Sequence, residues 1–235
     1  MKGVVLAGGK GARLAPYTKI LPKPLMPIGD MPILEVILRQ MKIAGITDVV
    51  LTVGHLSELL HAFFNNGSRF GINITYSFED KPLGTAGPIA LIKGLDETFL
   101  VTNGDVLTTL DIKDLIQFHK SQNAITTIAA HRRQEKIDLG VIQFNGNSQV
   151  VGYTEKPTYD FMVSMGMYVF EPEVLNYIPV GEYLDFPDLV KKMVAAGERV
   201  VGLPFEGYWQ DLGRPADYER AAVDFENMRN EFLKE

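Results

Sequence analysis

Apolar runs alternate with amphipathic segments over the first half of the 235-residue chain. Four short runs are rich in β-branched residues and are bounded by turn-forming residues, which is typical of buried strands. They cover residues 3–7, 48–53, 72–78 and 99–102. Between them, apolar residues recur at helical spacing from Asp30, a candidate N-cap, to about residue 42, and again over 56–65. Strands that alternate with helices predict a parallel sheet covered on both faces.

The pattern changes after about residue 125. Short strands are expected at 125–131, 139–144, 150–155 and 162–170, and the turn Asn145-Gly146-Asn147 favours an antiparallel hairpin. Helices are also expected at 88–94, 172–178 and 185–196, a further strand at 199–205, and a charged C-terminal helix to about residue 235. No repeat or flexible linker divides the chain, so we predict one domain over residues 1–235, with halves at 1–122 and 123–235.

Composition narrows the class of protein. The chain is 46% hydrophobic and 22% charged, as in ordinary globular proteins, and its lack of cysteine excludes disulfides, thiolate catalysis and zinc–thiolate sites. A net charge of −6 argues against a nucleic-acid-binding surface. No apolar run approaches the roughly 18 residues of a membrane span. Since the N-terminus leads directly into a strand, without a signal peptide, we expect a cytoplasmic protein with no nucleic-acid or membrane partner.

The first strand runs into a loop with three glycines and two cations: Gly8, Gly9, Lys10, Gly11 and Arg13. Glycines let backbone N–H groups converge on an anion, and two cations beside them point to phosphate. The dinucleotide motif G-x-G-x-x-G fails because Leu14 stands where the third glycine belongs, and the P-loop motif fails because Gly9 stands where lysine is required. A tight turn alone would explain the glycines but not the cations.

Two aspartates and two lysines complete the candidate chemistry. Asp105 follows a buried strand, and Asp211 lies in a glycine-containing turn. Taken alone, each is most simply interpreted as a turn-forming aspartate. Together, near a phosphate loop, they suit Mg²⁺, which takes one or two carboxylates and completes its shell with phosphate oxygens and water. Lys23 lies between two prolines and Lys156 precedes Pro157, so both are held rigidly, as a phosphoryl-transfer site requires.

Six motifs occur in one order along the chain: GGKGARL at 8–14, PKP at 22–24, PLGTAG at 82–87, NGD at 103–105, EKP at 155–157 and WQDLG at 209–213. This set resembles the sugar-1-phosphate nucleotidyltransferases, or nucleotide-sugar pyrophosphorylases, and residues 82–88 are most similar to the mannose-1-phosphate guanylyltransferases. The resemblance implies an α/β fold: a three-layer, Rossmann-like sandwich with a mostly parallel mixed sheet and a small antiparallel sugar-binding part. Residues 1–122 would form the nucleotide-binding half, and residues 123–235 the sugar-binding half and C-terminal helix.

The implied reaction is Mg²⁺-assisted in-line attack of a sugar 1-phosphate on the α-phosphorus of an NTP. The resemblance gives catalytic roles to Arg13, Lys23, Asp105 and Lys156, and metal-binding roles to Asp105 and Asp211. Nucleotide-binding roles fall on Leu6, Ala7, Gly8, Gly9, Lys10, Gly11, Arg13, Glu79, Pro82, Gly84 and Thr85. Sugar-phosphate-binding roles fall on Asn103, Gly104, Gly140, Glu155, Lys156, Ser164 and Gly166.

The base and the sugar are less sharply defined. Glu79 stands where a base-reading side chain is implied, and a carboxylate, which only accepts hydrogen bonds, suits the donors of guanine; this favours GTP. Ala12 replaces a usual threonine and so lacks a hydroxyl that could contact phosphate. Ser164 replaces a usual asparagine, which leaves the sugar open. Uridylyl-, thymidylyl- and cytidylyltransferases, a non-catalytic regulatory subunit and a nicotinamide-dependent oxidoreductase remain alternatives.

Two further expectations concern the C-terminal part. The chain has one helix after the last motif, so we expect a compact catalytic domain without a second activity. That helix carries Phe225, Met228 and Phe232, which either form a homo-oligomer face or pack within the molecule.

Overall fold

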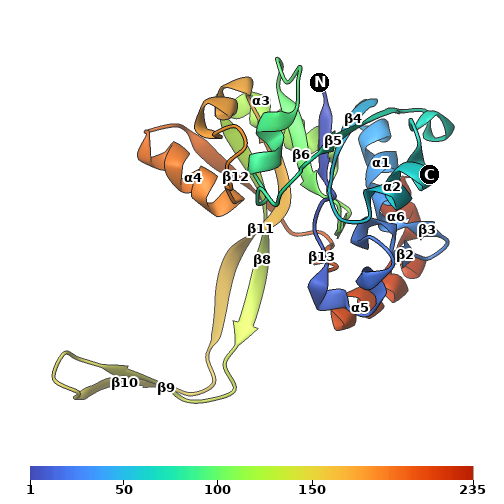
Figure 1. Cartoon of the computed structure of the whole chain (residues 1–235). Helices are drawn as coiled ribbons and strands as arrows, with labels where there is room; N and C mark the ends of the chain where they lie inside the picture. Colours follow the sequence, from blue (N-terminus) through green and yellow to red (C-terminus); the bar gives the residue numbers. More distant parts are fainter. Residues whose placement is uncertain (235) are drawn as a thin grey trace.

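A seven-stranded mixed sheet lies at the centre of the computed structural model, which describes residues 1–234 (Figure 1). Its order is β12-β8-β11-β6-β1-β4-β5, and all neighbours run parallel except that β11 is antiparallel to both β6 and β8. The predicted α/β fold with a mostly parallel sheet is confirmed. The strands are β1 (Gly3–Leu6), β4 (Asp48–Val53), β5 (Asn73–Phe78), β6 (Phe99–Asn103), β8 (Thr126–Lys136), β11 (Thr158–Phe170) and β12 (Val200–Phe205).

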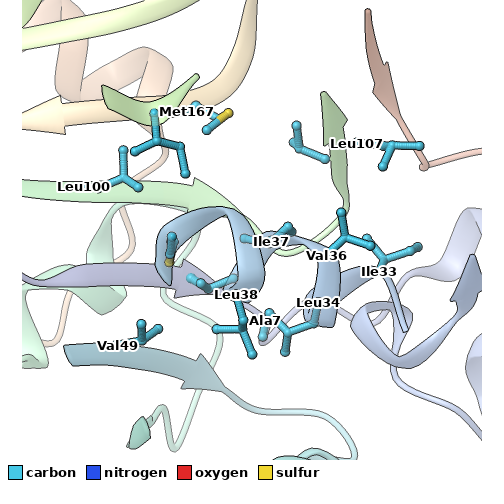
Figure 2. Packing of buried hydrophobic residues seen from close by; sticks show 14 of the residues in the cluster. Ala7, Ile33, Leu34, Val36, Ile37, Leu38, Val49, Leu100, Leu107 and Met167 are labelled. Atoms are coloured by element: carbon cyan, nitrogen blue, oxygen red, sulfur yellow. The ribbon is translucent and has the colours of Figure 1, made fainter. Parts of the chain in front are cut away.

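Two hydrophobic layers cover the sheet because side chains alternate across each strand. In β1, Val5 joins the layer packed under helix α1, whereas Val4 joins the layer on the opposite face. Figure 2 shows side chains of α1 packed against those of the strands. The helices are α1 (Ile33–Ile43), α2 (Ser57–Phe64), α3 (Ile112–Gln122), α4 (Phe186–Ala195), α5 (Pro215–Asn227) and α6 (Arg229–Leu233).

Several expected elements differ in detail. The helices predicted at 88–94 and 172–178 are 3-10 segments, η5 (Gly87–Leu91) and η6 (Pro172–Tyr177), each too short to complete two α-helical turns. Asp30 does not cap α1; Pro32 occupies the N-cap position, and Asp30 is ion-paired with Arg229 at 2.7 Å.

The C-terminal helix is interrupted at Met228, which separates α5 from α6. Phe225 and Phe232 are fully buried in the layer that also contains α1, and Met228 packs against that layer. Of the two alternatives for this helix, a homo-oligomer face or packing within the molecule, the structure therefore shows packing within the molecule. Within residues 1–234, no helix is long and apolar enough to cross a membrane.

Three small two-stranded sheets complete the fold. They pair β2 (Pro27–Ile28) with β3 (Met31–Pro32), β7 (Val106–Thr108) with β13 (Trp209–Asp211), and β9 (Val141–Phe144) with β10 (Val150–Thr154). The ladder of β8 and β11 continues past the central sheet to the pair Lys136↔Thr158, so both strands are longer than predicted. With β9 and β10 at its tip it forms a long arm, residues 131–164, that projects away from the rest of the molecule (Figure 1).

Candidate active site

A pocket of about 860 Å³ lies beyond the ends of β1, β4 and β6. These strands are parallel, so their carboxyl ends meet at one edge of the sheet, where ligands bind in open α/β folds. A smaller hollow of about 300 Å³ shares Leu6, Gly9, Arg13 and Asp105 with the pocket. The two volumes form one site.

The glycine loop makes one wall of this site. Gly8 lies close to Glu79, so a side chain at this position would run into the Glu79 carboxylate and displace it. Gly11 adopts a positive φ of 58°, which glycine reaches without strain. The guanidinium of Arg13 lies against Gly213, where a side chain would displace it. The loop thus presents backbone and two cations to the pocket, as the sequence predicted.

Lys23 lies between two carboxylates on the floor of the site. Its ammonium is hydrogen-bonded to Asp105 and lies 3.6 Å from Oδ1 of Asp211. Pairing of β7 with β13 brings the two aspartates together, since Asp211 is opposite Val106, and Leu212 N–H donates to the Asp105 carbonyl at 3.1 Å. Residues from three distant segments of the sequence therefore converge on one point.

One oxygen of this cluster has no hydrogen-bond partner. Oδ1 of Asp211 is buried and accepts no hydrogen bond, because the Lys23 ammonium at 3.6 Å is beyond hydrogen-bond distance; over residues 1–234 it is the only buried polar side-chain atom without a hydrogen bond. A buried carboxylate oxygen without a donor is costly, and a cation would satisfy it. No group of three or more possible metal ligands occurs within the described chain, and the cluster contains two carboxylates, Asp105 and Asp211. That number fits Mg²⁺ shared with a phosphate-bearing ligand.

The opposite wall carries groups that the sequence did not single out. Asp185 accepts hydrogen bonds from the N–H of Thr85 at 2.9 Å and from its hydroxyl at 3.1 Å. Tyr183 O–H donates to the same carboxylate at 2.6 Å, and this bond, together with those from Thr85, holds the pKa of Asp185 below its usual value. Asp185 and Thr85 are a hundred positions apart, so no local pattern links them.

Glu79 lies between the two walls. One carboxylate oxygen accepts the backbone N–H of Leu83 at 3.1 Å, and the other faces Gly8. The carboxylate is therefore held in the pocket by the loop at 82–87.

Most of the predicted site residues converge here, but five do not. Lining the pocket or the hollow are Leu6, Ala7, Gly8, Gly9, Lys10, Gly11, Arg13, Lys23, Glu79, Pro82, Gly84, Thr85, Asn103, Gly104, Asp105 and Asp211. Ser164 and Gly166 lie at the root of the arm, where a side chain on Gly166 would meet Asn103. Gly140, Glu155 and Lys156 lie on the arm itself and line neither volume.

Comparison with known proteins defines the class. Residues 2–228 match the family described as Nucleotidyl transferase, so the chain belongs to this family, as its six motifs implied.

Named relatives narrow the comparison. The chain is 34% identical to a UTP–glucose-1-phosphate uridylyltransferase of Synechocystis sp. and 36% identical to a mannose-1-phosphate guanyltransferase of Yarrowia lipolytica, over 94% and 93% of its length. It spans 62% of the length of each of these relatives. The crystal structure of a putative glucose-1-phosphate thymidylyltransferase from Bacillus anthracis superimposes with a TM-score of 0.76, at 26% identity, covering 95% of this chain and 94% of the other.

Proposed function

We propose that the protein transfers a nucleotidyl group from an NTP to a sugar 1-phosphate and releases pyrophosphate. The observation that carries this proposal is the cluster of Lys23, Asp105 and Asp211 on the floor of a pocket walled by the glycine loop. Such a site offers donors for a triphosphate and carboxylates for a metal.

In the proposed step, an oxygen of the sugar phosphate forms a bond to the α-phosphorus. The bond from that phosphorus to the bridging oxygen of the β-phosphate breaks, and pyrophosphate leaves with the electron pair. The glycine loop and Arg13 would hold the triphosphate, and Lys23 would stabilise the charge that develops on the α-phosphate. Asp105 and Asp211 would hold Mg²⁺, which when bound neutralises phosphate charge.

We propose GTP as the nucleotide and a manno-configured sugar phosphate as acceptor. Glu79 supports guanine because its fixed carboxylate offers only acceptors to the N1–H and N2 amino group. Guanyltransferases among the relatives support the same choice. The uridylyl- and thymidylyltransferases among the similar proteins support UTP or dTTP with glucose 1-phosphate as the second candidate.

The test is pyrophosphate release over a grid of four NTPs and several sugar 1-phosphates, with and without Mg²⁺. We expect metal-dependent release that is fastest with GTP and mannose 1-phosphate. Faster release with UTP or dTTP would overturn the base assignment and leave the reaction intact. Nucleotide binding without release for any pair would overturn the reaction in favour of a non-catalytic nucleotide-binding subunit.

A substitution tests the base assignment directly. Glu79→Gln replaces one acceptor oxygen with a donor, so we expect the preference for GTP over UTP to fall about tenfold or more. Glu58→Gln, an exposed carboxylate on α2, is the matched control and leaves the preference unchanged. An unaltered preference in Glu79→Gln would refute the role of this carboxylate.

A further inference from the structure

The arm exposes an apolar face that nothing in the described chain covers. At its tip, antiparallel pairing places Phe144 opposite Val150 and Ile142 opposite Tyr153, and alternation puts all four on one face. Between 45% and 63% of each of these side chains is exposed. Below them, the rings of Tyr159 and Phe161 lie 6.4 Å apart, also exposed. A two-stranded ribbon is marginally stable alone, so a surface of this kind marks an interface.

The root of the arm is fastened to the body. Trp209 Nε1–H donates to the Met165 carbonyl at 3.0 Å, and the Trp209 ring lies 5.5 Å from that of His131. His131 Nε2 is in turn 3.0 Å from the Gly207 carbonyl. These contacts fix the direction in which the arm leaves the sheet. Its tip cannot fold onto its own body without breaking them or the long β8–β11 ladder.

Charge indicates what kind of surface the arm meets. Residues 131–164 contain four basic and four acidic residues, so the arm has no net charge to attract nucleic acid or an anionic membrane. A neutral ribbon with one apolar face is suited to a protein surface. The second copy of the chain is the partner that is always available to it.

The pocket is also short of positive charge. Over the pocket and the hollow together, four cations and five carboxylates from the described residues 1–234 line the site, although its proposed ligands are a triphosphate and a sugar phosphate. Lys156, the remaining lysine of the six motifs, is exposed on the arm in the bend before β11, whose residues from Thr158 to Ser164 alone span roughly 20 Å at about 3.3 Å each. It has a positive φ of 43°, and such strain is typical of functional positions.

We infer that two copies of the chain exchange arms, so that the partner subunit's Lys156 completes the sugar-phosphate side of each pocket. The arm starts from the same edge of the sheet as the pocket, because β8 is parallel to β6 by way of β11. A twofold axis beside that edge therefore carries each arm toward the other pocket, as an isologous dimer requires. The inference rests on the proposed function for the role of the lysine, but not for the exchange of arms.

Complementation separates arms that act in trans from arms that act in cis. One subunit carries Lys23→Met, which disables the body, and the other carries Lys156→Met, which disables the arm; each homodimer is expected to lose about 10²-fold in activity. In a heterodimer purified through two tags, exchange pairs an intact body with an intact arm at one of its two sites. We therefore expect about half of the wild-type rate. Lys136→Met, another exposed lysine of the arm, is the matched control in place of Lys156→Met.

Cross-linking gives a readout that does not depend on activity. The chain has no cysteine, so Thr154→Cys on the arm and Lys10→Cys in the pocket form a unique pair for a bis-maleimide, with each single variant as a control. Exchange predicts a covalent dimer of twice 26.1 kDa, specific to the double variant. It also predicts that Ile142→Asp gives a monomer by sedimentation, whereas Gln143→Asp, on the opposite face, stays dimeric.

The outcomes divide cleanly. A monomeric wild type, a cross-link confined to one chain, or an inactive heterodimer beside an active wild type would overturn arm exchange. A covalent dimer of the double-cysteine variant, together with a wild type that turns over no NTP with any sugar phosphate, would overturn the proposed function and keep the exchange.

Discussion

Substituting Asp211 with asparagine separates the metal role of the site from its structural role. Oδ1 of Asp211 is buried without a donor, which costs stability, while attraction to Lys23 at 3.6 Å offsets that cost. The side chain is 47% exposed, so solvent screens the attraction to about 1 kcal/mol or less. The two effects nearly cancel. We expect the free energy of unfolding of Asp211→Asn to stay within about 1 kcal/mol of wild type, or roughly 2–4 °C in Tm.

Activity is expected to respond far more strongly. An amide is a weaker Mg²⁺ ligand than a carboxylate, and a loss of about 3 kcal/mol of transition-state stabilisation is a loss of about 10²-fold in kcat/KM. The Mg²⁺ concentration for half-maximal rate is expected to rise at least about tenfold. Urea unfolding and pyrophosphate release over a Mg²⁺ titration measure the two effects.

Two variants serve as references for this prediction. Asp188→Asn, an exposed carboxylate of α4 paired with Lys191, is expected to change neither property. Asp105→Asn breaks the more deeply buried pair with Lys23 and is expected to lower both stability and activity. If Asp211→Asn unfolds several kcal/mol more easily with an unaltered Mg²⁺ dependence, the cluster is a structural ion pair and the metal assignment fails.

Two further predictions concern stability. Leu38→Ala removes a fully buried side chain of α1, so we expect the free energy of unfolding to fall by about 2–5 kcal/mol. Leu59→Ala, at a half-exposed position of α2, is the control and is expected to lower it by less than about 1 kcal/mol. Equal effects of the two variants in urea unfolding would contradict the packing of α1. Asp185→Ala tests the pH dependence. Hydrogen bonds from Tyr183 and Thr85 lower the pKa of Asp185, so its contribution is present above about pH 4, the unfolded value, and is lost as the pH falls through the folded pKa. The stability gap between wild type and Asp185→Ala should therefore narrow from pH 7 to pH 3 in urea unfolding, and a gap that widens would reverse the sign of this effect.

Local sequence patterns were sufficient to predict the sheet and the glycine loop. The run Val4-Val5-Leu6 is apolar at every position because both faces of β1 are buried, and that pattern identifies a central strand. In contrast, the 3-10 segment η5 looked like a helix, since its apolar residues pack similarly in either form. In a segment this short, the spacing of apolar residues indicates which side chains are buried. It does not distinguish the hydrogen-bond pattern of a 3-10 segment from that of an α-helix.

The residues that make up the site were harder to predict from the sequence than the sheet was. Asp105 and Asp211 were predicted as a pair by motif, but their convergence on Lys23 depends on β7 pairing with β13, an antiparallel pairing across about a hundred residues. Asp185 was missed because its partner, Thr85, is equally distant in sequence. Side-chain contacts between distant segments follow from the topology, which one-dimensional patterns constrain only in part.

For the arm, the sequence predicts the strands but not the surface that they contact. Its alternating apolar pattern predicts strands, and the register of β9 and β10 follows from the turn between them, yet neither feature specifies what the apolar face covers. The motif Glu155-Lys156-Pro157 suggested a lysine in the pocket, whereas the structure holds that lysine on the arm, away from its own pocket. The two observations are compatible if the pocket belongs to a second copy. The sequence of one chain specifies the apolar face of the arm and the position of Lys156 on it. Which copy of the pocket they contact is determined only when two chains assemble.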